Sequence, residues 1–165
     1  MKKNLKSTQL QIRVSGTQKA ALRRLANRAG MSMSDWVLRK ALPPLSETFQ
    51  GLVDALSTAK KPGYVLAELN ELLSQLTAAE FELAVSDPPQ ARLDSYWENY
   101  VAAMIEQAAA KKGAAAPSWT DGVRPLQQPA FGSSLKSLRL HLLTHSPVAF
   151  RCRNIFIDSS IGDRV

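Results

Sequence analysis

The stretch Gln9-Leu10-Gln11-Ile12-Arg13-Val14, near the start of a 165-residue chain, alternates polar and apolar side chains without a break. Successive side chains of a β-strand point to opposite faces. The apolar face of such a strand would hold Leu10, Ile12 and Val14, and the polar face would hold Gln9, Gln11 and Arg13. A lone strand cannot keep its apolar face out of water. The pattern therefore predicts that two chains pair their strands in a homodimer.

Two short helices are expected directly after this strand. Capping-box spacing predicts where they begin, at Ser15 with Gln18 and at Ser32 with Asp35. The first helix is expected over about 17–29, with Leu25 and Ala26 on its apolar stripe. Gly30 suits the left-handed residue that follows a helix, and Pro43 and Pro44 end the second helix near Leu42.

Positive charge is concentrated in the same segment. The chain has a net charge of +7, but residues 1–42 carry +9, residues 43–112 carry −5 and residues 113–165 carry +3. A basic footprint of this kind favours the phosphate backbone of nucleic acid. A solubilising basic end is the alternative explanation of the charge taken alone.

The alternating strand, the two capped helices and the Gly30-to-Leu42 stretch resemble the ribbon-helix-helix DNA-binding family over about residues 7–42. The resemblance implies that Gln9, Gln11 and Arg13 reach base edges in the major groove of duplex DNA. It also implies that the second helix binds a phosphate near Ser32 and Ser34. Gln and Arg suit adenine and guanine edges, and amides at a helix N-terminus bind anions. The family often has an arginine where this chain has Trp36-Val37-Leu38, which leaves the role of Arg39 open.

The rest of the chain predicts a mainly α fold. Apolar residues recur at helical spacing through 43–112, with breaks near 60–63 and 87–89, and a long helix is expected over about 90–111. Residues 113–132 are rich in Pro, Ala and Gly and predict a linker or strap. A last helix is expected over about 134–145, with Leu135, Leu138, Leu142 and Leu143 as its stripe, and a short strand at 155–157. Three domains are therefore expected, namely a DNA-binding and dimerisation domain (1–42), a helical domain (43–112) and a partner-binding tail (113–165).

The tail carries residues suited to a protein interface. Trp119, Phe131 and Phe150 are expected to be exposed along it, and Arg151 and Arg153 flank Cys152. Arginine is frequent at interface hot spots. The tail from Ser133 is similar to the C-terminal ends of antitoxins, and this similarity implies that the tail holds a toxin. A strap with exposed aromatic side chains would gain most by wrapping a partner, so these five residues are the expected partner-binding residues. The alternatives are solvated terminal arginines, and helices that enlarge the dimer core.

We therefore expect an antitoxin-type transcriptional regulator, a repressor that binds operator DNA as a dimer and neutralises a toxin. An alternative is a plasmid mobilisation or partition accessory protein that binds an origin. Another is a protein-interaction scaffold that never binds DNA. Gene neighbourhood would separate the first two, and salt-dependent DNA binding would separate both from the third.

Enzyme activity is the class with the least support. The chain has no phosphate-loop, dinucleotide or Gly-x-Ser-x-Gly pattern, and His141 and His145 have helical spacing but no third metal ligand nearby. We expect no cofactor and no metal. No apolar run approaches the ~18 residues of a membrane helix, and no apolar segment follows the N-terminal lysines as in a signal peptide. With its single cysteine, Cys152, the protein is expected in a reducing cytoplasm.

Overall fold

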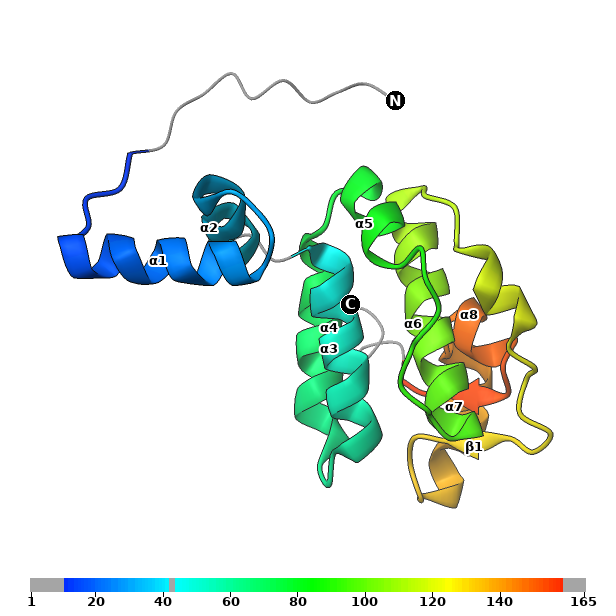
Figure 1. The fold of residues 1–165 in the computed structure, drawn as a ribbon. Helices are drawn as coiled ribbons and strands as arrows, with labels where there is room; N and C mark the ends of the chain where they lie inside the picture. The colour runs from blue at the N-terminus through cyan, green and yellow to red at the C-terminus, as the bar shows by residue number, and fades with distance from the viewer. Residues whose placement is uncertain (1–10, 42–43, 159–165) are drawn as a thin grey trace. The chain divides into compact units, whose positions relative to one another are not determined.

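The computed structural model describes residues 11–41 and 44–158, and the chain divides into two compact units, Met1–Pro43 and Pro44–Val165 (Figure 1). The described residues are mainly helical, with a single two-stranded sheet among them, which confirms the expected mainly α class. Each unit is described by itself below.

The first unit is a pair of helices, α1 (Gly16–Arg28) and α2 (Met33–Ala41). Both begin where the capping residues predict. The Ser15 side chain accepts a hydrogen bond from the Gln18 backbone N–H, and the Ser32 side chain accepts one from the Asp35 N–H. Between the helices, Gly30 has a φ of +66°, a conformation that favours glycine because it has no Cβ. The two predicted capping boxes and the glycine therefore set the path of this unit.

The second unit starts with four helices: α3 (Leu45–Thr58), α4 (Pro62–Gln75), α5 (Ala78–Ala84) and α6 (Ser95–Lys112). Thr77 and Glu80 form the capping box of α5. The Thr77 backbone N–H donates to the Glu80 carboxylate, and this hydrogen bond lowers the pKa of Glu80. The α6 helix begins later than the expected residue 90. Asp94 caps it, and the Gln50 side chain holds the preceding residues by bonds to the Pro88 carbonyl and the Gln90 N–H. Gln50 lies about forty residues away, so the local sequence could not reveal this restraint.

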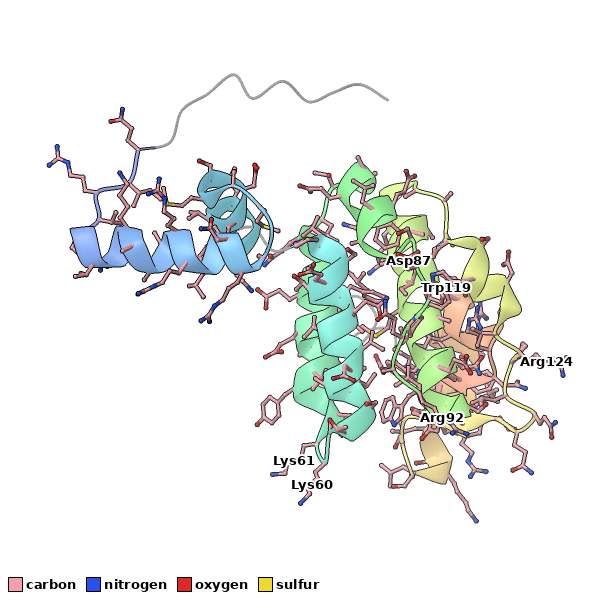
Figure 2. The ribbon with its side chains drawn as sticks, viewed as in Figure 1. Lys60, Lys61, Asp87, Arg92, Trp119 and Arg124 are labelled. Atoms are coloured by element: carbon pink, nitrogen blue, oxygen red, sulfur yellow. The ribbon has the colours of Figure 1, made fainter. Side chains whose placement is uncertain are left out.

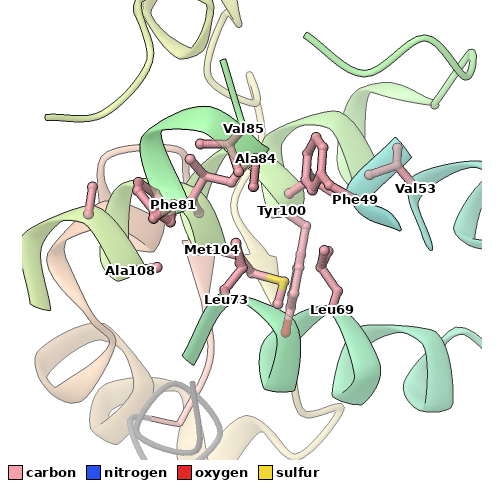
Figure 3. Close-up of a cluster of buried hydrophobic side chains, with 14 of the residues drawn as sticks. Phe49, Val53, Leu69, Leu73, Phe81, Ala84, Val85, Tyr100, Met104 and Ala108 are labelled. Carbon is pink, nitrogen blue, oxygen red and sulfur yellow. The ribbon is translucent and has the colours of Figure 1, made fainter. Parts of the chain in front are cut away.

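The core of the second unit forms around α6 (Figure 3). Residues 99–105 of this helix are all buried, so α6 has no solvent-facing stripe along that stretch. Large side chains from the other helices pack on it: Phe49 and Val53 of α3, Leu69 and Leu73 of α4, and Phe81 of α5. One core therefore joins side chains of α3, α4, α5 and α6.

The C-terminal segment completes that core. It contains η1 (Ser118–Gly122), β1 (Ala130–Phe131), η2 (Lys136–Leu138), α7 (Arg139–His145), α8 (Val148–Arg151) and β2 (Ile155–Phe156). The strands β1 and β2 pair in parallel, with Ala130 opposite Ile155 and Phe131 opposite Phe156. The α8 helix packs against α6. The described part of 113–165 therefore belongs to the same compact unit as the helices before it.

Two expectations for this segment were wrong. Phe150, expected to be exposed, is 1% exposed because α8 inserts it beside Tyr100 of α6, with ring centroids 5.2 Å apart. The expected buried stripe of the last helix is reduced to Leu142, because Leu135, Leu138 and Leu143 are 41–60% exposed. The helix is also shorter than expected, since the 3₁₀ turn η2 replaces its first turn.

Candidate nucleic-acid interface

The described part of the predicted ribbon, residues 11–14, is fully open to solvent in the single chain. Gln11 and Arg13 are exposed, and so are the apolar Ile12, at 60%, and Val14, at 42%. These four residues form no strand here, and Gln9 and Leu10 lie outside the described residues. Ile12 and Val14 are β-branched and lie two residues apart, so they would face the same side of a strand. A second strand paired with this one would bury them.

The first unit has very little core of its own. Among the side chains that the structure describes within residues 11–41, only that of Ala26 is buried. Leu25 of α1 is 42% exposed and Leu38 of α2 is 38% exposed. A unit of about forty residues needs more buried apolar surface than this for stability, which metals, disulfides or association usually supply. The apolar surface of this unit is thus arranged for association.

Cations line the exposed positions of α1. Lys19, Arg23, Arg24 and Arg28 are all exposed, and Asp35 is the one acidic residue within 11–41. Long cationic side chains on one short helix form a site for the phosphates of a nucleic-acid backbone. These contacts would position DNA without selecting its sequence.

The N-terminus of α2 is the predicted phosphate site. Ser32 and Ser34 are both exposed there. The Ser32 hydroxyl is used within the cap, since it accepts from the Asp35 N–H at 3.1 Å and donates to the Asp35 carboxylate at 2.7 Å. Any phosphate would therefore rely on the remaining amides of the first turn and on the Ser34 hydroxyl. The carboxylate of Asp35 would oppose it.

Of the five predicted partner-binding residues, Phe150 and Arg153 are buried in the second unit. Arg153 is 5% exposed, and its guanidinium donates to the Glu106 carboxylate, to the carbonyls of Thr120 and Val123 at 2.9 and 3.2 Å, and to the Asn99 side chain at 3.3 Å. The Asn99 side chain in turn donates to the Arg124 carbonyl at 3.0 Å. This network ties η1 and the residues that follow it, up to Arg124, to α6.

The other three residues lie closer to the surface and do not form one site with them. The half-buried Trp119 donates its indole N–H to the Val85 carbonyl at 2.9 Å (Figure 2). Phe131 stacks on Phe156 of β2, with centroids 5.2 Å apart. Arg151 is exposed. Their contact with a partner stays a prediction.

A shallow cleft near Trp119 was not expected from the sequence. Its volume is about 270 Å³. It is lined by Pro88, Pro89, Ala91, Leu93, Glu98, Trp119, Gly122 and Val123. The Asp87-Pro88-Pro89 break was visible as a helix terminator, but its approach to Trp119 depends on the tertiary fold. Among these eight lining residues Glu98 is the one with an ionisable side chain. The lining therefore does not supply both an acid and a base.

The histidine pair is accounted for by local contacts. The His141 and His145 rings stack with centroids 4.1 Å apart, and the His141 Nε2 atom lies 3.4 Å from the Asp158 carboxylate. Across residues 11–41 and 44–158, no group of three or more His, Cys, Asp or Glu side chains is placed to hold a metal ion. In the same residues, no helix is long and apolar enough to cross a bilayer.

Comparison with known families found a match for the first unit. Residues 4–43 match the family model of NikA-like proteins, described as mobilization protein NikA, which is a ribbon-helix-helix family. The match covers about a quarter of the chain and supports the interpretation of this segment as a ribbon-helix-helix DNA-binding element. Comparison with curated proteins and with solved structures returned no match.

Proposed function

We propose that this protein is a DNA-binding accessory factor of plasmid mobilisation, whose first unit binds duplex DNA at a transfer origin as a ribbon-helix-helix dimer. One observation carries the proposal. The segment that matches the mobilisation family, residues 4–43, coincides with the segment that holds the basic charge and the alternating ribbon pattern. Family, charge and local structure thus support one function for the same forty residues.

Dimerisation is part of the proposal because the first unit leaves its apolar side chains exposed. Ile12 and Val14 would be buried by the same residues of a second chain, in an antiparallel ribbon around a two-fold axis. Leu25 and Leu38 would enter the core of the dimer. Each copy would then bury apolar surface that it cannot bury alone.

The polar face of that ribbon would carry the sequence-reading side chains. Gln9, Gln11 and Arg13 from both copies would enter the major groove, where glutamine and arginine make paired hydrogen bonds to adenine and guanine. The exposed cations of α1, with Ser34 and the amides at the start of α2, would contact the phosphates on either side. Binding should therefore combine a specific term from the ribbon with a salt-dependent term from α1.

An antitoxin-type repressor would use the same dimer, so the first unit alone does not separate the two functions. Mobilisation is favoured because the matching family is one of mobilisation proteins. A toxin contact through Phe150 and Arg153 would require the second unit to open, since both side chains are buried in it. The tail therefore gives the antitoxin function little support.

The DNA-binding part is tested with Arg13→Ala in the full chain, by gel shift on the DNA that flanks its own gene. Loss of a base contact should weaken specific binding by about 1–3 kcal/mol, or about fivefold to 150-fold. Lys19→Ala is the matched control, because it should weaken specific and non-specific binding alike and reduce the salt slope by about 1. Unchanged specific binding by Arg13→Ala would remove the ribbon from the interface.

The biological part is tested by mating. Deleting the gene should lower transfer of a plasmid that carries the flanking region, and the parent gene but not the Arg13→Ala gene should restore it. Expression of the neighbouring genes without this one should leave growth unaffected. Growth arrest relieved by this gene, with transfer unchanged, would instead establish the antitoxin function.

A further inference from the structure

The second unit exposes a cluster of large apolar side chains on its last helical segment. Leu135, Leu138, Leu140 and Leu143 are 60%, 41%, 74% and 41% exposed, and Val148 of α8 is 62% exposed. Within residues 44–158, the other large hydrophobics of this kind are Tyr64 and Leu83. Five exposed large apolar side chains fall within fourteen residues, at the start of η2 and on η2, α7 and α8, a concentration of the kind that marks protein contacts.

Three cations lie at this surface, beside one carboxylate, that of Asp158, which lies against His141 of α7. The sequence has no acidic residue between Asp121 and Asp158. Lys136, Arg139 and Arg151 are exposed among the leucines, and none of the three forms an ion pair with a described residue. The Arg139 guanidinium lies over the Phe131 ring, 5.0 Å from its centroid, which holds this cation at the surface. We call these eight side chains of residues 135–151 the basic leucine surface.

The helices α3 to α5 carry the opposite charge. Their exposed carboxylates include Asp54, Glu68, Glu71 and Glu82, none of which forms a salt bridge with a described residue. The same helices expose Tyr64 of α4, at 78%, and Leu83 of α5, at 71%. Tyr64, Glu68 and Glu71 follow i, i+4, i+7 spacing and so share one face of α4. We call these six side chains the acidic surface.

The two surfaces lie on different sides of the same unit. The α6 helix packs against α4 on one side and α8 on the other, so it separates the acidic helices from the C-terminal ones (Figure 1). The acidic surface of a molecule is therefore poorly placed to cover its own leucines. The corresponding surface of another molecule has no such restriction.

We propose that the basic leucine surface of one copy binds the acidic surface of a second copy, head to tail, and links ribbon-helix-helix units into larger assemblies. The opposite charges supply orientation, and the leucines with Tyr64 and Leu83 supply the apolar contact. A head-to-tail contact leaves one surface unoccupied at each end of an assembly. Further copies can therefore add there, to give an open chain of molecules or a closed ring. Copies bound side by side on one DNA would meet at high effective concentration, which strengthens a weak contact of this kind.

Duplex DNA and lipid are less suitable occupants of the basic leucine surface. Protein–DNA interfaces are strongly polar, whereas this surface has five large apolar side chains and three cations. Three cations without an exposed aromatic side chain give weak attraction to an anionic bilayer. The acidic surface, in contrast, has both the charge and the exposed apolar residues that complement the cluster.

The proposal is tested by sedimentation velocity of the full chain without DNA. At about 0.1 M salt, where the screening length is about 10 Å, the sedimentation coefficient should rise with concentration beyond that of the ribbon-paired dimer. At about 1 M salt, where the screening length is about 3 Å, the rise should be lost. A single species at all concentrations and both salts overturns the proposal.

Charge reversal identifies the surfaces. Arg139→Glu with Arg151→Glu should weaken the assembly at least about tenfold, and Glu68→Arg with Glu82→Arg should do the same. All four changes in one chain should restore assembly, because both surfaces are then reversed and again complementary. Arg92→Glu, an exposed cation outside both surfaces, is the control and should have no effect. Thermal denaturation confirms that each variant is folded.

Restoration by the fourfold variant cannot result from misfolding or from loss of DNA binding. If it stays dissociated while both double variants are folded, the two surfaces do not bind each other. Vesicles of mixed phosphatidylserine and phosphatidylcholine serve as the lipid probe. If the parent protein cosediments with them and the Arg139→Glu, Arg151→Glu variant does not, with assembly equal in both, the surface binds lipid and the proposal is overturned.

Discussion

The guanidinium of Arg153 is buried, and each of its three nitrogen atoms donates a hydrogen bond. It binds the Glu106 carboxylate and two backbone carbonyls of the 118–126 segment. Asn154, which follows it with a φ of +59°, donates to the Leu126 carbonyl. Two adjacent side chains thus bind backbone carbonyls of η1 and of the irregular residues that follow it.

Replacing Arg153 by Leu should lower the free energy of unfolding by about 3–5 kcal/mol, because the change leaves Glu106 and two carbonyls without their donor. Arg151→Leu is the matched control. Arg151 is two residues away but exposed, so its replacement should change stability by less than about 0.5 kcal/mol. Urea denaturation of both variants measures the difference. Equal losses would mean that the buried network does not stabilise the unit.

Tyr100 gives the second unit an alkaline limit. Tyr100 lies on α6, and its burial in the core raises its pKa from the ordinary 10.0 to about 12. Folding favours the neutral phenol, so its contribution to stability is complete below about pH 10 and is lost as the pH rises through about 12. The loss should amount to roughly 2–3 kcal/mol. Tyr100→Phe should flatten the stability profile between these values, measured by denaturation at fixed pH, whereas Tyr64→Phe, at a ring 78% exposed, should leave it unchanged.

At the scale of elements, residues 11–14 differ from the helices that follow them. The helices α1 and α2 pack on each other, but residues 11–14 contribute two exposed apolar side chains and no strand. The helices α1 and α2 are set by their caps and by Gly30, which are local features. A ribbon formed with a second molecule is therefore a prediction of its own, separate from the two helices.

Ile12→Lys should dissociate the dimer while leaving the second unit folded. In the single chain Ile12 is 60% exposed, so the change removes no intramolecular core contact; in the paired ribbon it would bury a charge. Gln11→Lys, on the polar face of the same stretch, should leave the dimer intact. Light scattering at micromolar concentration compares the two. A dimer that tolerates Ile12→Lys would exclude strand pairing as its basis.

The whole molecule consists of two units with different requirements. The first has one buried side chain among those that the structure describes in residues 11–41, whereas the second has a continuous core from Phe49 to Ile157. The tail supplies Phe150, Ile155 and Ile157 to that core. The C-terminal segment is thus part of a fold and not an appendage to it.

Removing residues 113–165 should therefore abolish cooperative unfolding of the second unit, because α6 loses the side chains that cover one of its sides. Calorimetry of the shortened chain should lack a transition that the full chain has. Deletion of residues 1–43 is the matched control and should retain it, since the two units have separate cores. A shortened chain with the full transition would mean that 44–112 folds without the tail.

The local sequence was sufficient for the helices of the first unit. Hydrogen bonds between residues three apart determine the caps at Ser15 and Ser32, and the left-handed turn at Gly30 needs only the absence of a Cβ. The basic charge and the alternation at 9–14 are likewise readable without a structure. For this reason the helix positions of the first unit, and its similarity to ribbon-helix-helix proteins, could be predicted.

Only the tertiary structure decided what the tail does. Phe150 and Arg153 look like interface residues in a tail that follows a Pro-rich, Ala-rich stretch. Nothing near them in sequence shows that they contact Tyr100, Asn99 and Glu106, which lie about fifty residues earlier on α6. The same long-range packing buries Leu142 and leaves its neighbouring leucines in solvent. Burial depends on which distant element arrives at a given face, and that is a property of the folded chain and not of spacing along it.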